Sequence, residues 1–183
     1  MKKKLLALLV IGFAVVGSSC NKIKDATDQN ITLTGADVTF TVTPKATSDA
    51  VVVLNSQIIT ADLDALIKKE APSFSLKNLK SLKIKTLTAE ITAGADANNS
   101  FANLNEIAAV IEATGKTPFT ATYSSSSTTK IDKINFTVNN SVDLKDLLSS
   151  GTLNYTLKSK VRSATDKNLT VKVVSTYDAV VGL

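Results

Sequence analysis

The sequence predicts an all-β protein, an antiparallel β-sandwich of immunoglobulin-like or jelly-roll-like type with one or two short helical insertions. First, apolar and polar residues alternate with a period of two in many segments, as in strands with one face in water. Second, about eight or nine such segments recur every 10 to 20 residues, with no long helical pattern between them. Third, residues 31–183 are enough for one compact core, so we expect a single sandwich domain there.

The first expected strands lie before residue 60. Val38, Phe40 and Val42 alternate with threonines until a proline ends the pattern. Residues 50–59 form a second, more continuously apolar strand. Antiparallel pairing across residues 45–49 is the shortest connection, so we expect a hairpin here.

Residues 60–70 break this alternation and predict a short helix packed on a sheet. Thr60 can cap the helix, Asp62 and Asp64 lie in its first turn, and two lysines lie in its last turn before a proline. This distribution of charge suits the helix dipole. The carboxylate pair lacks the glycine and the further oxygen ligands of a calcium loop, so we expect it to serve the helix only.

Residues 79–92 predict a strand with a change of phase. Leu82 and Ile84 share one parity, whereas the apolar residues from Leu87 onward share the other. A β-bulge at residues 85–86 would return both sets to the core side.

Residues 101–114 are compatible with two structures. The spacing of residues 101, 104, 108 and 111 suits a helix, whereas that of 107, 109 and 111 suits a strand. We favour a helical turn near Leu104 followed by a strand to Ala113, because the neighbouring segments are strands.

The C-terminal third predicts two more strands, a helical turn and a hairpin. The strands are residues 119–123 and 134–138, and the helical turn is residues 142–149. The clearest alternation in the chain runs through residues 153–161 and 169–177. We expect these last two strands to pair across the turn between them.

The N-terminus predicts an export signal. Lysines at positions 2–4 precede an apolar run at 5–16, small residues and then Cys20, the only cysteine. The run of about 12 residues is shorter than the roughly 20 that a membrane-spanning helix needs. A cationic start, an apolar middle and small residues are typical of a secretory signal peptide, so residues 1–19 are expected to be removed.

The segment Gly17-Ser18-Ser19-Cys20 resembles the lipobox that ends the type II signal peptide of bacterial lipoproteins, including those of Bacteroidota. It departs from the family at Gly17, where leucine is preferred. The resemblance covers only the N-terminus and implies that Cys20 is acylated and becomes the first residue of the mature chain. Because two or more acyl chains hold a protein stably on a bilayer, the implied partner is a membrane, reached through a polar tether at residues 20–30.

The implied location is the cell envelope. Asn21 is not the aspartate that favours inner-membrane retention in enteric bacteria, so the periplasmic face of the outer membrane is expected. We recognise no family for residues 31–183.

Composition narrows the chemistry. The chain has no histidine, which excludes histidine-based catalysis and metal sites, and its single cysteine excludes disulfides and zinc–thiolate clusters. The net charge of +5 falls to +2 without the three signal lysines, because 18 of the 21 basic residues then face 16 acidic ones. We therefore expect no enzymatic activity, no cofactor, no metal and no nucleic-acid partner.

One run of positive charge stands out at residues Lys77, Lys80, Lys83 and Lys85. Such a surface suits anionic lipid or an acidic envelope protein. The alternative is that these lysines form a solvated face that keeps the sheet from pairing with its neighbours.

Two functions follow from these observations. The first is a non-enzymatic binding or structural module of the cell envelope, held on the membrane by lipid. The alternative is a carrier of a lipid or another small apolar ligand. The carrier requires an apolar cavity of several hundred Å³, whereas the structural module requires a filled core and an exposed interface patch.

Overall fold

The computed structural model describes residues 28–183, so the predicted signal peptide, Cys20 and most of the predicted tether lie outside the described residues. The elements of this part follow in chain order: β1 (Gln29–Thr34), β2 (Val38–Val42), β3 (Ser48–Thr60), α2 (Leu63–Glu70), the 3₁₀ turn η1 (Leu76–Asn78), β4 (Leu79–Ala93), the 3₁₀ turn η2 (Phe101–Asn103), β5 (Leu104–Glu112), β6 (Phe119–Ser124), β7 (Lys133–Asn135), α3 (Lys145–Leu148), β8 (Thr152–Val161) and β9 (Leu169–Val181). β1 begins at Gln29, one residue before the end expected for the tether.

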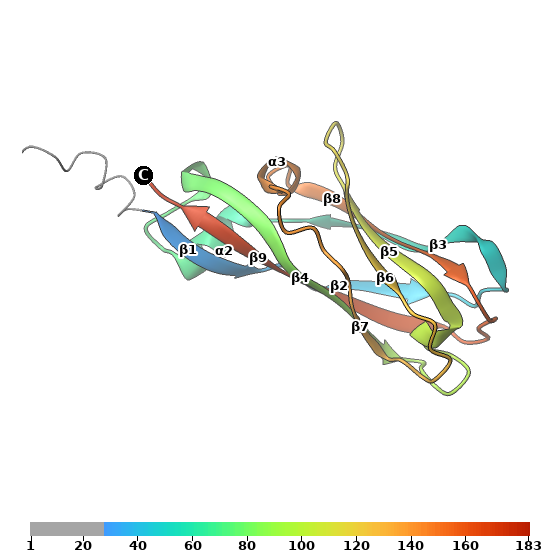
Figure 1. Cartoon of the computed structure of the whole chain (residues 1–183). Coiled ribbons are helices and arrows are strands. Elements are labelled where there is room, and N and C mark those ends of the chain that lie inside the picture. The colour runs from blue at the N-terminus through green and yellow to red at the C-terminus, as the bar shows by residue number, and fades with distance from the viewer. Residues whose placement is uncertain (1–27) are drawn as a thin grey trace, which may run out of the picture.

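The strands form two antiparallel sheets that pack against each other (Figure 1). Sheet A has the order β1-β9-β4-β7, with β2 also paired to β9, and sheet B has the order β3-β8-β5-β6. Apolar side chains from both sheets and both helices meet in one core. The predicted β-sandwich with short helical insertions is confirmed.

Both expected hairpins are wrong, because each pair of strands is divided between the sheets. β2 pairs with β9 and β3 with β8, while β8 and β9 belong to different sheets. Period-two alternation shows that a strand has one buried face but does not identify its neighbour. The β2–β3 and β8–β9 connections both cross between the sheets, and they are hydrogen-bonded to each other. The Thr165 N–H donates to the Lys45 carbonyl at 2.9 Å, and the Lys45 N–H donates to the Thr165 hydroxyl at 3.0 Å.

The predicted helix exists, but its cap is Asp62 and not Thr60. Thr60 is the last residue of β3, and the Asp62 carboxylate accepts the Ala65 N–H at 2.9 Å. Leu63 and Ile67 are buried, and the lysines occupy the last turn as expected. The helix therefore lies on the sandwich as an amphipathic cover.

The predicted phase change in β4 is confirmed, with a register shift against β9 between Ile84 and Thr86. The preferred structure for residues 101–114 is confirmed too, as η2 followed by β5. The strand expected at 134–138 is shorter, because the chain crosses from sheet A to sheet B after β7. Thr137 already exchanges two backbone hydrogen bonds with Thr122 of β6.

Candidate ligand pocket between the sheets

A pocket of about 360 Å³ lies between the sheets, at the end covered by α2. This volume is at the lower end of the range for small-molecule sites. Five separate parts of the chain surround it: the β1–β2 turn, the segment from the end of β3 into α2, α3, and the two facing strands β8 and β9. The lining residues are Thr34, Gly35, Ala36, Ile59, Thr60, Ala61, Asp62, Leu63, Ala65, Leu66, Leu148, Leu153, Tyr155 and Tyr177.

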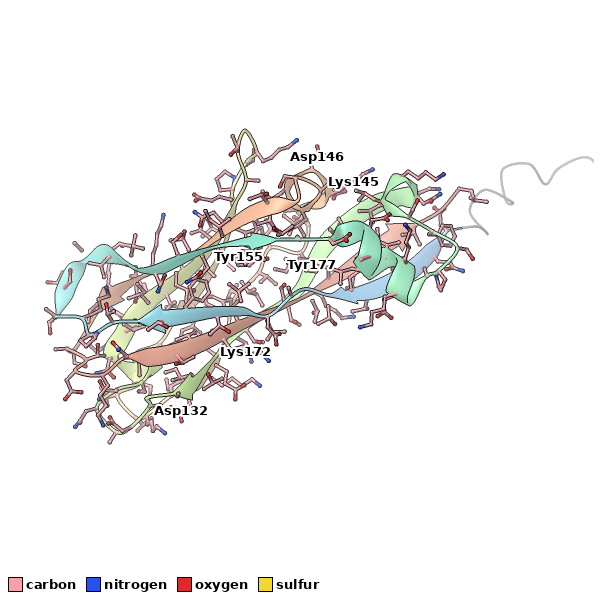
Figure 2. The ribbon with its side chains drawn as sticks, turned by 180° about the vertical axis from the view of Figure 1, so that it is seen from behind. Asp132, Lys145, Asp146, Tyr155, Lys172 and Tyr177 are labelled. Carbon is pink, nitrogen blue, oxygen red and sulfur yellow. The ribbon has the colours of Figure 1, made fainter. Side chains whose placement is uncertain are left out.

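The floor of the pocket is buried and mostly apolar. Leu63, Leu148 and Leu153 are buried, and so are Tyr155 and Tyr177. The two tyrosines come from opposite sheets, and their hydroxyl oxygens lie 3.3 Å apart (Figure 2). The floor therefore offers one hydroxyl pair within an apolar wall.

Burial raises the pKa of both phenols above the ordinary value of about 10. For Tyr155, the neighbouring Tyr177 adds to the effect of burial. Both hydroxyls are therefore protonated at neutral pH, and they can donate or accept a hydrogen bond without supplying charge.

The β1–β2 turn closes over the floor through Gly35. The Gly35 N–H donates to the Ser175 carbonyl at 2.9 Å. A Cβ atom at position 35 would lie 2.5 Å from the Ser175 hydroxyl and 3.2 Å from the Tyr177 ring. Only glycine lets the turn approach β9 this closely.

The mouth of the pocket is formed by exposed residues, namely Thr34, Ala36, Thr60, Asp62 and Ala65. Asp62 is the one charged side chain in the lining, and its carboxylate already caps α2. The lining contains no lysine or arginine. The electrostatic character of the pocket is thus apolar with one negative charge at its entrance.

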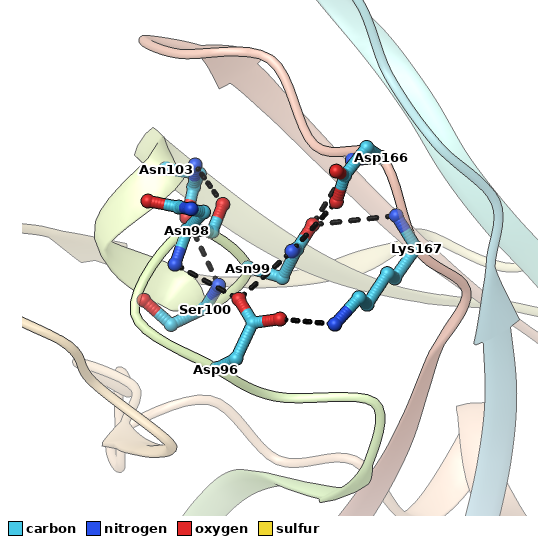
Figure 3. A network of polar contacts seen from close by, with 7 residues as sticks. All are labelled: Asp96, Asn98, Asn99, Ser100, Asn103, Asp166 and Lys167. Carbon is cyan, nitrogen blue, oxygen red and sulfur yellow. Dashed lines mark hydrogen bonds and ion pairs between the residues drawn. The ribbon is translucent and has the colours of Figure 1, made fainter.

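The other end of the sandwich is held by a polar network that joins the loop after β4 to the β8–β9 connection (Figure 3). The side-chain amide of buried Asn99 donates to Asp96 at 2.9 Å and to Asp166 at 2.8 Å. Lys167 forms an ion pair with Asp96 at 2.5 Å, and its hydrogen bond holds the pKa of that carboxyl well below its usual range. These contacts order two loops.

Asn103 completes this network beneath the loop. Its side-chain oxygen accepts the Ser100 N–H at 2.9 Å, and its side-chain nitrogen donates to the Asn98 carbonyl at 2.9 Å and to the Ser163 hydroxyl at 3.0 Å. Asn103 and Ser100 are both buried. The hydrogen bonds of this network join its own residues, so we assign it a structural role.

The four predicted surface lysines are all exposed, but their charges are not equally free. Lys80 pairs with Asp28 at 2.5 Å and Lys85 with Asp178 at 2.9 Å, whereas Lys77 and Lys83 form no ion pair within residues 28–183. β4 has β9 on one side, and β7 and residues 143–144 on the other. Lys80, Lys83 and Lys85 therefore lie on the outer face of sheet A, in a strand with neighbours on both sides, whereas Lys77 lies in η1 ahead of it.

No group of three or more metal-ligating side chains occurs among residues 28–183. In the same part of the chain, no helix is both long and apolar enough to cross a bilayer.

Comparisons with known proteins identify no relative. No protein-family description and no curated protein sequence matches the chain. Among solved structures, the decameric BFDV capsid protein matches over 84% of this chain and 98% of its own, with 14% identity and a TM-score of 0.37. The 60-mer BFDV capsid protein matches over 84% of this chain and 92% of its own, with 13% identity and a TM-score of 0.32.

Proposed function

We propose that this chain is a lipid-anchored, non-enzymatic binding protein of the cell envelope, and that its β-sandwich binds a small apolar ligand in the pocket beneath α2. The observation that supports this role is the pocket itself. Its apolar floor persists although α2 and the β1–β2 turn pack over it, and its volume is about 360 Å³. A cavity of this kind is what a carrier requires.

The pocket is tested by what the protein retains on purification. The full chain with Cys20→Ser, isolated without detergent, is expected to carry a bound apolar molecule in native mass spectrometry. Ala65→Trp places a large ring at the exposed mouth, and it should abolish that mass shift. Lys69→Trp puts the same ring on the same helix outside the lining and serves as the control. If the folded Cys20→Ser protein never carries a bound ligand, the carrier role is contradicted.

The anchor is tested separately at Cys20. Cells fed radioactive palmitate should label the wild-type chain and leave Cys20→Ser unlabelled. The labelled protein should fractionate with the outer membrane and resist protease added to intact cells, as expected for a periplasmic orientation. An unlabelled wild type that fractionates like Cys20→Ser would refute the anchor without touching the pocket.

A structural role is the second candidate, favoured by an apolar patch on β3. Val51, Val53 and Ile58 are 59%, 52% and 75% exposed. A register shift between Val53 and Asn55 puts all three on the outer face although their parity differs. β3 is an edge strand of sheet B, so its outer side is open to another chain. Crosslinking in intact cells from a photoreactive residue at Ile58 should trap an envelope protein if this role holds, and no product if it does not.

A further inference from the structure

We propose that the pocket selects its ligand by charge: it accepts an apolar chain with a neutral or cationic head and rejects one with a carboxylate, such as a fatty acid. This proposal rests on the binding role proposed above. The arrangement that supports it is one carboxylate, Asp62, at the mouth of a pocket whose lining has no positive charge.

No group at the mouth of the pocket would bind an anion favourably. The N-terminus of a helix ordinarily attracts negative charge, but in α2 the Asp62 carboxylate already occupies that position and accepts the Ala65 N–H. The two lysines of α2 lie in its last turn, and Lys68 is engaged by Asp64 at 2.5 Å. A carboxylate entering the mouth would therefore meet Asp62 without compensation, whereas an ammonium head would pair with it.

The floor does not reverse this preference. Its only polar groups deep in the cavity are the hydroxyls of Tyr155 and Tyr177, which stay uncharged and bond to each other. Moving an ionised head down to them would strip it of water with no opposite charge in return. The apolar tail thus belongs at the floor and the head at the mouth.

The volume sets the length of the chain. At about 30 Å³ for each water-sized group, 360 Å³ holds about a dozen such groups. A chain of about ten carbons with a small head fits this space. Decylamine, decanol and decanoate are therefore matched probes that differ only in the charge of the head.

The test uses the full chain with Cys20→Ser and Tyr123→Phe, without detergent, at low salt and about pH 7.5, where the amine is protonated and the carboxylate ionised. The chain has no tryptophan and three tyrosines, so the two remaining tyrosines report on the floor by fluorescence. We expect decylamine to bind at least tenfold more tightly than decanoate, with decanol between them, and the ratio to shrink as salt is added.

Asp62→Asn should bring the three affinities to within about twofold of one another, because asparagine caps a helix as well as aspartate does. Asp146→Asn, which removes a carboxylate outside this lining, should leave the ratio unchanged. Decanoate binding as tightly as decylamine, or a ratio that survives Asp62→Asn, would overturn charge selection while leaving the binding role intact. Failure of all three probes to bind would overturn the binding role, and the selection with it.

Discussion

The two ends of the β-sandwich are closed by different kinds of contact. At the network end, side-chain amides of Asn99 and Asn103 satisfy the backbone of two loops, and a hollow of about 450 Å³ beside Asn103 is lined by amide, hydroxyl and guanidinium groups as well as alanines. At the pocket end, α2 and the β1–β2 turn bring apolar side chains, and about 360 Å³ remains open. The two hollows therefore differ in their linings, which include amides and an arginine at the network end and are mostly apolar at the pocket end.

The contrast also separates stability from binding. A buried amide with all its partners is costly to remove, because each partner is left unpaired. A side chain at the exposed mouth of the pocket, such as Asp62 or Ala65, can change more cheaply, because it has space to adjust. Substitutions at the network end should therefore reduce stability most, and those at the pocket mouth should mainly alter ligand binding.

The largest expected effect is that of Asn103→Ala. It removes the acceptor of the buried Ser100 N–H, and it removes the donor of two partly buried hydrogen bonds, to the Asn98 carbonyl and the Ser163 hydroxyl. We expect a loss of about 3 kcal/mol in the free energy of unfolding, measured by urea denaturation. Asn98→Ala is the control, because Asn98 is exposed and only its backbone joins the network. If both variants lost the same free energy of unfolding, the buried hydrogen bonds of the Asn103 side chain would not be the cause of the loss.

A smaller effect is expected for Gly35→Ala at the pocket end. The added methyl group would lie 2.5 Å from the Ser175 hydroxyl, so the Ser175 side chain must rotate or the turn must move away from β9. We expect a loss of about 2 kcal/mol in urea denaturation. Adding Ser175→Ala removes the closest atom and should recover about half of that loss, although the Tyr177 ring remains at 3.2 Å. If the losses in the free energy of unfolding caused by Gly35→Ala and Ser175→Ala simply add in the double variant, the contact with Ser175 is not the cause of the Gly35→Ala loss.

The strands were predictable because each depends on a local pattern. Alternation located β2, β4, β6, β8 and β9, and the change of parity after Ile84 placed the bulge in β4. The pairing of strands was not predictable, because two strands with one apolar face each are equally satisfied in one sheet or in facing sheets. The contact between Thr165 and Lys45 that joins the crossings has no local signature.

The candidate site was less accessible to sequence reasoning. Tyr155 and Tyr177 were expected only as core residues, because their positions in the alternation say that they are buried and not that a space lies beside them. Asp62 was identified as an acid of the first helical turn, yet its place at a mouth depends on the distant turn at Gly35. The network did leave a trace, since Ser100 and Asn103 have the spacing of a capping box.

The effect that is smallest near neutral pH is a dependence of stability on alkaline pH that arises at the pocket floor. Tyr155 and Tyr177 have a higher pKa in the folded protein than in the unfolded chain, so the unfolded chain loses its protons first as the pH rises. The free energy of unfolding should therefore be unaffected by them below about pH 10 and fall above it, by up to about 1.4 kcal/mol per pH unit for each tyrosine.

The double variant Tyr155→Phe with Tyr177→Phe should lose most of this slope, while Tyr123→Phe, whose side chain is outside the lining, should keep it. Asn103→Ala should lower the whole curve without changing its slope, because an amide does not titrate in this range. Urea denaturation at a series of pH values measures all four proteins. If the double variant retained the full slope, the alkaline sensitivity would arise from other groups, such as the surface lysines, and not from deprotonation of Tyr155 and Tyr177.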